Sequence, residues 1–364
     1  MYNGVFGLRF LSIDQKSADM LARYQIALIS RGLAYMMASA VFLYLINNYL
    51  VYWQDLPGTF SLMSHYAVAG LEKLDPPLDD EQITQGWIQF VSYLSILVLS
   101  FAYALRTSTR SLLQDSIRLS ALSAYIIRLS FWSVLLVGFI DMIISFLRVE
   151  NFLNFWVGEH LERQLGRPIF RGTYVHYPLI FVSAILAARF RSISFSWLAI
   201  MVVLAEFLIV ITRFVFSYEQ AFMGDIVRFW YAALFLFASA SALVEEGHVR
   251  VDVLYAGFSC RTKAWIDSIG CTMLGIPICW VILMHGMGGR GNSINSPLLS
   301  FEVSQSGYGM YINYLMAGFL VVFAVSMLIQ FVSYLLFNIA ELNSQSKDPD
   351  RPSYQQLIAS GKSD

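Results

Sequence analysis

The sequence predicts an all-α, polytopic membrane protein with about eight transmembrane helices. Hydrophobic residues make up 57% of the chain and charged residues only 13%, and the mean hydropathy is +0.59. A soluble domain needs more charge than this on its surface. The apolar residues are also gathered in long stretches separated by short polar connections. In lipid, such a stretch can satisfy its own backbone hydrogen bonds only as a helix.

A helix needs about 20 largely apolar residues to cross a membrane, and roughly eight stretches approach that length. They cover residues 32–53, 87–105, 121–147, 174–190, 193–216, 226–244, 265–287 and 308–337. The third and the eighth are long enough to tilt or to project from the membrane. The fourth is short and is separated from the fifth only by Arg191 and Ser192, so whether it crosses fully is left open.

Two connections have the pattern of interfacial amphipathic helices. In residues 106–118, apolar side chains recur between polar ones at helical spacing, although a solvated connection explains that segment equally well. The second is the polar dip at residues 245–255, between the sixth and seventh spans. There, Asp252 is placed to cap a short helical turn. Ser259 is placed to cap the following helix, which carries Trp265 into the bilayer.

The distribution of lysine and arginine predicts that both termini lie in the cytosol, because basic residues accumulate on the inner side of a membrane. On this assignment the first outer connection, residues 54–86, is acidic, as expected. The second outer connection, residues 148–173, is the exception, since it contains Arg148, Arg163, Arg167 and Arg171. The leader, residues 1–25, and the polar tail, residues 342–364, are then cytosolic, and the tail is predicted to be mostly disordered.

Several charged residues fall within or at the edges of spans, where an unpaired charge is costly. They are Arg31, Arg128, Asp141, Glu206, Arg213, Asp225 and Arg228. Arg31, Arg213 and Arg228 lie near a membrane surface, which an arginine can reach by snorkelling. Asp141 and Glu206 lie deeper, so each should face protein and find a partner or take up a proton. Arg213 follows Glu206 on the same helix face. Pairing between helices or subunits is favoured over a proton or ion path. The residues predicted to form this intramembrane polar network are Asp141, Glu206, Arg213, Asp225 and Arg228.

Nothing in the sequence predicts an enzyme, a cofactor or a nucleic-acid site. His176 is isolated, while His248 and His285 lie at opposite membrane surfaces, so they do not form the facing pair that haem ligation needs. The glycine-rich run at residues 286–291 follows a helix on the outer side, where a flexible loop is the better interpretation.

The polar dip also carries a sequence resemblance. Its run Gly-His-Val-Arg-Val-Asp at residues 247–252, followed by Ser-Cys-Arg-Thr-Lys-Ala-Trp-Ile-Asp at residues 259–267, resembles the small membrane subunit (DctQ type) of tripartite ATP-independent periplasmic (TRAP) transporters. Weaker similarity extends over residues 193–341, including Glu302 and Ser304 of an outer loop. Two departures are Cys260, where the family often has proline, and residues 314–317, where a lysine and a proline are expected.

The resemblance implies a four-helix region at residues 193–341, preceded by an added four-helix region at residues 26–192. The added spans have bulky apolar faces and few pairs of small residues, so we expect them to enlarge the membrane footprint of the complex. It also implies a multi-pass subunit of the bacterial inner membrane. Such a subunit braces the large elevator-type membrane subunit of a sodium-driven symporter, which takes up small organic anions from a periplasmic substrate-binding protein. Contacts with the large subunit or with membrane lipids are expected at Glu245, Glu246, His248, Arg250, Asp252 and Trp265.

Two other classes of protein stay open at this point. A stand-alone secondary transporter or channel would account for the deep carboxylates Asp141 and Glu206. A membrane anchor of an enzyme complex would account for the basic inner surface and the amphipathic segments. The transported substrate cannot be read from the sequence.

Overall fold

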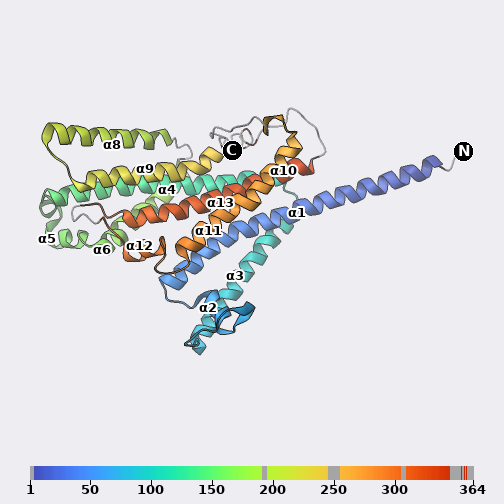
Figure 1. The fold of residues 1–364 in the computed structure, drawn as a ribbon, viewed down its shortest axis with the longest axis horizontal. Coiled ribbons are helices and arrows are strands. Elements are labelled where there is room, and N and C mark those ends of the chain that lie inside the picture. Colours follow the sequence, from blue (N-terminus) through green and yellow to red (C-terminus); the bar gives the residue numbers. More distant parts are fainter. Residues whose placement is uncertain are drawn as a thin grey trace. The chain divides into compact units, whose positions relative to one another are not determined.

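The computed structural model describes residues 4–190, 195–244, 255–304 and 309–344, together with Tyr354, Gln356 and Ile358. Within these residues the regular secondary structure is helical, and no strand occurs (Figure 1). Eight helical segments are long and apolar enough to cross a membrane. They are Met20–Tyr52, Asp80–Arg106, Leu112–Val149, Pro168–Arg189, Ser196–Phe216, Ala221–Ala240, Cys260–Met287 and Asn313–Asn343. The predicted all-α, polytopic fold is therefore confirmed.

The elements follow one another with short connections. In chain order they are α1 (Gly4–Tyr52), α2 (Gly58–His65), η1 (Val68–Gly70), α3 (Asp80–Arg106), α4 (Leu112–Val149), α5 (Leu153–Leu165), α6 (Pro168–Arg171), η2 (Gly172–His176), α7 (Tyr177–Arg189), α8 (Phe195–Phe216), α9 (Ala221–Val244), η3 (Tyr255–Gly257), α10 (Cys260–Gly270), η4 (Cys271–Gly275), α11 (Ile276–Met287), α12 (Asn295–Ser300) and α13 (Asn313–Asn343). Helices α6, η2 and α7 run on without interruption. The fourth span is thus 22 residues long, enough to cross a bilayer.

Side-chain caps fix the starts of α3 and α10. At α3, the Asp79 carboxylate accepts a hydrogen bond from the Gln82 N–H at 2.7 Å, and the Gln82 side chain accepts one from the Asp79 N–H at 3.2 Å. At α10, the Ser259 hydroxyl accepts a hydrogen bond from the Thr262 N–H at 3.2 Å, as predicted for this serine. Both arrangements satisfy N–H groups that a helix start leaves unpaired.

Residues 106–118 do not form a separate interfacial helix, so this prediction was wrong. Helix α3 ends at Arg106, a short connection follows, and α4 begins at Leu112 and continues without a break to Val149. Ser111 caps this helix: its hydroxyl accepts a hydrogen bond from the Gln114 N–H at 3.2 Å. The residues after Leu112 are instead the first turns of a long helix that continues into the apolar run.

The chain divides into two compact units. The first contains Met1–Ser120, Arg250–Ile276 and Phe331–Asp364, and the second contains Ala121–Val249 and Pro277–Gln330. Each unit therefore draws residues both from the predicted added region and from the predicted 193–341 region.

In the first unit, α1 packs against α3 and α2 also packs against α3. Arg31 of α1 is buried, with only 2% of its surface exposed, and it forms an ion pair with Asp115 of α4. The Asp115 carboxylate also accepts a hydrogen bond from the Tyr35 hydroxyl at 2.9 Å. Arg31 was expected to snorkel to the membrane surface. Instead, the carboxylate stabilises its charge inside the protein.

In the second unit, α4, α9 and α13 supply most of an apolar core. Aromatic side chains dominate it: the rings of Phe229 and Phe319 lie 5.1 Å apart, and those of Phe237 and Phe319 lie 5.0 Å apart. Helix α8 contributes Leu198, which is fully buried, but most of its other side chains are exposed.

Part of the C-terminal tail differs from the predicted disorder. Tyr354 and Ile358 are buried. The Tyr354 hydroxyl lies 2.9 Å from the Ser333 hydroxyl, and its ring lies 5.0 Å from that of Tyr334. These two apolar residues are four positions apart, a spacing that puts both on one face of a helical turn. This short apolar pattern is hard to recognise in the sequence because the rest of the tail is polar.

Candidate functional site

A network of buried charged and aromatic side chains lies in the second unit, and Asp141 of α4 is at its centre. The Asp141 side chain is fully buried. One carboxylate oxygen accepts hydrogen bonds from Arg171 Nη1 at 2.9 Å and from His176 Nε2 at 3.1 Å. The other accepts a hydrogen bond from the Tyr311 N–H at 2.8 Å. Both oxygens of this deep carboxylate are thus occupied by protein groups.

Arg171, at the end of α6, is the countercharge. Its side chain is as buried as that of Asp141. Its Nε donates to the Leu165 carbonyl at 2.9 Å, and its guanidinium carbon lies 4.1 Å from the centre of the Tyr311 ring. A buried ion pair is tolerated when further hydrogen bonds and ring contacts replace the lost water. Here Nε, Nη1 and the Tyr311 ring provide them, while Nη2 is buried without a hydrogen-bond partner among the described residues.

His176 links Asp141 to α13. Its Nδ1 lies 2.8 Å from the Tyr314 hydroxyl, and the two rings stack with their centres 5.8 Å apart. The sequence left His176 isolated, and it gave no role to Arg171, Tyr311 or Tyr314. One signal pointed to such a partner: a deep aspartate requires a cation, and an outer connection rich in arginine follows it.

A second buried carboxylate, Asp225 of α9, approaches the same backbone segment. One of its oxygens accepts a hydrogen bond from the Met310 N–H at 3.0 Å, and the other pairs with Arg228 at 3.0 Å. Asp141 and Asp225 therefore hold the adjacent N–H groups of Tyr311 and Met310, immediately before α13 begins. We call these two carboxylates and the backbone of residues 309–311 the aspartate clamp.

Gly309 is the first residue of the aspartate clamp, and its lack of a side chain is required there. A Cβ atom at this position would lie 2.4 Å from the Ser304 Cβ and 2.6 Å from the Asp225 carboxylate. Only glycine allows the backbone to pass so close to these groups.

The arginines of the second outer connection are largely engaged. Arg148 donates hydrogen bonds to the Tyr311 hydroxyl and to the Gly309 carbonyl, the latter at 3.3 Å. Arg163 pairs with Glu159 at 3.2 Å, and Arg171 pairs with Asp141. These residues act as countercharges and donors, which accounts for an arginine-rich connection on the side predicted to be outside.

Glu206 and Arg213 of α8 lie apart from this network. The Glu206 side chain is exposed near the middle of the helix, with no ion-pair or hydrogen-bond partner among the described residues. Arg213 pairs instead with Glu219 at 3.3 Å, in the connection to α9. The intramembrane residues predicted to form one polar network thus separate into Asp141, Asp225 and Arg228 on one side and Glu206 and Arg213 on the other.

Further hydrogen bonds join neighbouring helices in this unit. Arg128 of α4 donates to the Ala187 carbonyl near the end of α7, at 3.3 Å. Tyr218 donates to Glu150 at 2.6 Å, which ties the α8–α9 connection to the end of α4. Burial and this hydrogen bond raise the pKa of Tyr218 to about 12, so its hydroxyl remains a donor at physiological pH.

The predicted outer-loop residues lie beside the aspartate clamp. The Glu302 side chain is exposed, while its carbonyl accepts a hydrogen bond from the Tyr314 N–H at 3.1 Å, in the first turn of α13. Ser304 is the residue closest to where a Cβ at position 309 would stand.

Most of the predicted interface residues of the polar dip lie outside the described residues: Glu245, Glu246, His248, Arg250 and Asp252. Trp265 is described. It lies on α10 with 54% of its surface exposed.

The geometry favours a structural role for the buried network. Its carboxylates are filled by N–H donors and guanidinium groups, which leaves no open position for a transported ion at Asp141. Among the residues that the structure describes, no group of three histidine, cysteine, aspartate or glutamate side chains could hold a metal ion.

Eight helical segments long and apolar enough to cross a membrane define a multi-pass membrane protein. Residues 199–337 match the model of the family described as "Tripartite ATP-independent periplasmic transporters, DctQ component", so this region of the chain is similar to that family. The predicted resemblance is thereby confirmed, and the residues before 199 are a long N-terminal extension of the matched region. No curated protein and no solved structure matches the chain.

Proposed function

We propose that the chain is the small permease subunit of a sodium-driven, binding-protein-dependent TRAP transporter of the bacterial inner membrane. It braces the stationary scaffold of the large elevator-type subunit while that subunit takes up small organic anions, such as carboxylates, delivered by a periplasmic binding protein. The family match over residues 199–337 carries this proposal. The family is a transporter component, which favours a role in transport over a catalytic one.

The aspartate clamp supports a bracing role. A brace must hold its helices in fixed positions while its partner moves. Asp141 and Asp225 fasten the segment before α13 to α4 and α9 through bonds of 2.8 and 3.0 Å. A carrier of ions or protons would need a carboxylate that opens to water, whereas the oxygens of Asp141 are filled by protein donors.

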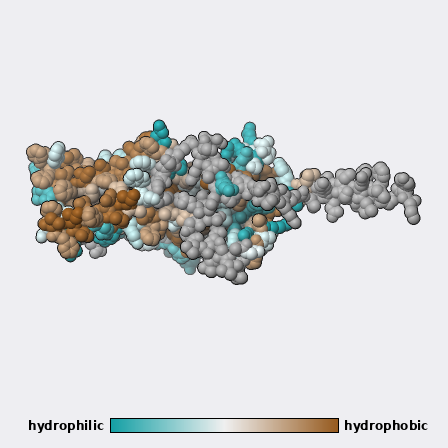
Figure 2. Space-filling view, turned by 90° about the horizontal axis from the view of Figure 1, so that it is seen from above, coloured by the Kyte–Doolittle hydropathy of each residue, from teal (hydrophilic) through white to brown (hydrophobic). Residues whose placement is uncertain are grey.

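Helix α8 supports the presence of a large membrane partner. Its 22 residues are strongly apolar, and it packs mainly against α9. Figure 2 views the molecule from the side on which α8 lies in Figure 1, and the left part of that face is mostly hydrophobic. Glu206 lies near the middle of α8 and is exposed. A carboxylate facing lipid is costly, so we infer that the large subunit covers Glu206 and supplies its partner.

Co-purification tests this proposal. The tagged full chain, co-expressed with the large membrane subunit of the same transporter, should recover that subunit in a stable complex. A Glu206→Leu variant should recover at least about tenfold less, because it leaves the partner's polar group unpaired. A Glu159→Gln variant, which changes an exposed carboxylate outside the spans, is the control.

The results separate the alternatives. Full assembly by the Glu206→Leu variant would show that this residue faces lipid, and would contradict its place in the interface. Recovery of a cytosolic enzyme with no large polytopic subunit would overturn the transporter role in favour of a membrane anchor.

A further inference from the structure

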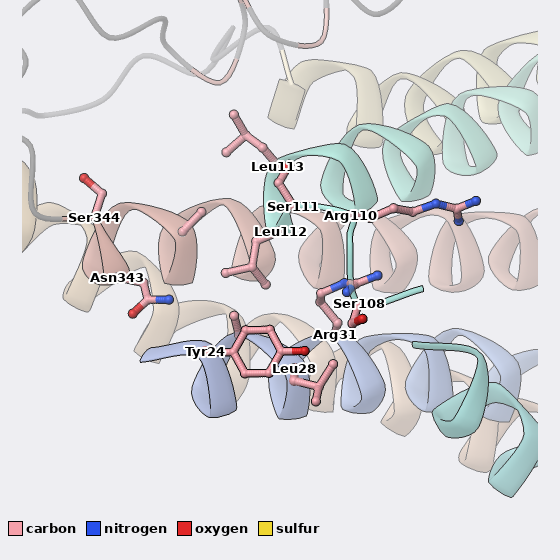
Figure 3. Close-up of a pocket in the computed structure, with 12 residues that line it drawn as sticks. Tyr24, Leu28, Arg31, Ser108, Arg110, Ser111, Leu112, Leu113, Asn343 and Ser344 are labelled. Atoms are coloured by element: carbon pink, nitrogen blue, oxygen red, sulfur yellow. The ribbon is translucent and has the colours of Figure 1, made fainter. Parts of the chain in front are cut away.

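A pocket of about 340 Å³ lies in the first unit, at the end of the helices predicted to face the cytosol (Figure 3). Three segments line it: the part of α1 near Arg31, the connection from α3 into α4, and the last residues of α13. Asn343 and Arg23 hold two of these segments together, since the Asn343 side chain donates to the Arg23 carbonyl at 3.0 Å and Arg23 donates to the Asn343 carbonyl at 2.8 Å. These two hydrogen bonds hold α1 and the end of α13 together beside the pocket.

Arg31 presents an unused donor to this pocket. Its Nε bonds to Asp115, and its Nη2 bonds to the carbonyl and hydroxyl oxygens of Thr107 at 2.8 and 3.0 Å. Nη1 has no hydrogen-bond partner in the part of the chain that the structure describes. Only 2% of the Arg31 surface is exposed, and its guanidinium group always carries a charge. Nη1 keeps access to solvent where Arg31 lines the pocket, so a ligand that enters the pocket can accept a hydrogen bond from it.

Arg110 provides a second cation at the rim. Figure 3 shows its side chain extending from the connection before α4. One of its terminal nitrogens donates to the Tyr103 hydroxyl at 2.6 Å, and no ion pair with a described acidic residue balances its charge. The hydrogen bond with Tyr103 raises the pKa of Arg110 above its ordinary value.

The start of α4 adds backbone donors to the same wall. Leu112 and Leu113 are the first residues of this 38-residue helix, and their N–H groups have no acceptor within it. A helix start carries a partial positive charge and attracts anionic groups. Arginine side chains and helix N–H groups together form a set of donors suited to a phosphate.

The remaining walls are apolar. Leu28, Leu112 and Leu113 line the pocket, as does Tyr24, which is 52% exposed. Beyond the pocket, α1 continues with exposed apolar side chains such as Leu21, at 61% exposure. We propose that this pocket binds the phosphate group of an anionic phospholipid, whose acyl chain lies along α1. The cytosolic leaflet of a membrane is rich in anionic lipids, which agrees with the predicted orientation. Free phosphate would use the same donors but leave the apolar walls unoccupied.

Lipid retention by the purified full chain tests this inference independently of transport. The protein in neutral detergent is incubated with phosphatidylglycerol or phosphatidylcholine, and bound lipid is counted by native mass spectrometry. We expect retention of phosphatidylglycerol. Arg110→Ala should reduce it by about tenfold, since a charge-assisted hydrogen bond is lost. Leu113→Trp, which fills the pocket, should also reduce it.

Arg106→Ala is the matched control, because Arg106, the last residue of α3, is an exposed arginine close in sequence that does not line the pocket. It should change retention by less than about twofold. Equal losses in Arg106→Ala and Arg110→Ala would indicate non-specific attraction and overturn the site. Full retention by Arg110→Ala and Leu113→Trp would also overturn it. Displacement of the lipid by millimolar inorganic phosphate alone would assign the pocket to a soluble anion instead.

Discussion

Asp141 and Asp225 show how single residues define this fold. Each uses one carboxylate oxygen for a cation and the other for a backbone N–H, so that a costly buried charge becomes a fixed point for the chain. The position of Asp141 in an apolar run predicted that it needs a partner. The identity of that partner, Arg171, could not be predicted, because it depends on how helices distant in sequence pack together.

Replacing Asp141 by asparagine should destabilise the protein strongly. Arg171 would remain buried without its countercharge, at a cost of roughly 3–5 kcal/mol. Thermal unfolding in detergent would show a lowered midpoint. In the Asp141→Asn, Arg171→Met double variant, part of the loss should be recovered, because no buried charge remains. Equal midpoints for the wild type and Asp141→Asn would contradict the importance of the ion pair.

Gly309→Ala should also lower the unfolding midpoint. Its new methyl group would overlap Ser304 and the Asp225 carboxylate, and overpacking of this kind costs about 1–3 kcal/mol. Gly291→Ala is the control, since nothing lies within 4 Å of a Cβ at that position. If the two variants unfold alike, the aspartate clamp does not require glycine.

At the scale of elements, hydropathy predicted all eight spans because each needs only a sufficient run of apolar residues. Prediction from the local sequence pattern was wrong where that pattern fits two structures and only the packing of the whole chain decides between them. The period at Leu112 fitted both a surface helix and the first turns of a spanning helix, and the continuity of α4 decided between them. The buried network escaped prediction because Tyr311 and His176 are ordinary polar residues until packing brings them to Asp141.

The docked part of the tail offers a prediction at this scale. Tyr354→Phe removes the contact with the Ser333 hydroxyl and should lower the free energy of unfolding by about 0.5–1.5 kcal/mol. Tyr354→Ala should lower it further, because the contacts with Tyr334 and Phe337 are lost as well. Thr109→Ala, at an exposed position outside the tail, should have little effect. Limited proteolysis of the tail provides a second measurement, with faster cleavage expected in Tyr354→Ala.

At the scale of the whole molecule, the N-terminal extension and the family region are interleaved. Residues from both occur in each compact unit, and Asp141, Arg171 and His176 of the extension bind Tyr311 and Tyr314 of the family region. That the added helices enlarge the membrane footprint without contacting substrate stays a prediction. The boundary near residue 193 is one of sequence resemblance, which need not coincide with a boundary of packing.

Deletion of residues 1–192 should therefore prevent stable folding of the remainder. The Tyr311 N–H and the Tyr314 hydroxyl would lose their buried partners, and α13 would lose its contact with α4. We expect little protein in the membrane, measured by immunoblot, and partial recovery when residues 1–192 are supplied as a separate chain. Removal of residues 1–19 alone is the control. Normal levels of the fragment 193–364 would show that the extension is dispensable.

The exposed carboxylate of Glu206 has a consequence for the lifetime of the subunit in the cell. In the proposed complex this group is covered by the large subunit, so before assembly it would face hydrocarbon, a feature by which membrane quality-control proteases can distinguish an orphan subunit from an assembled one. We expect the chain to be degraded quickly when its partner is absent and to persist when the partner is present. In a pulse-chase experiment, Glu206→Leu should lengthen the half-life of the orphan chain. The same residue would then both join the complex and match the amount of this subunit to that of its partner.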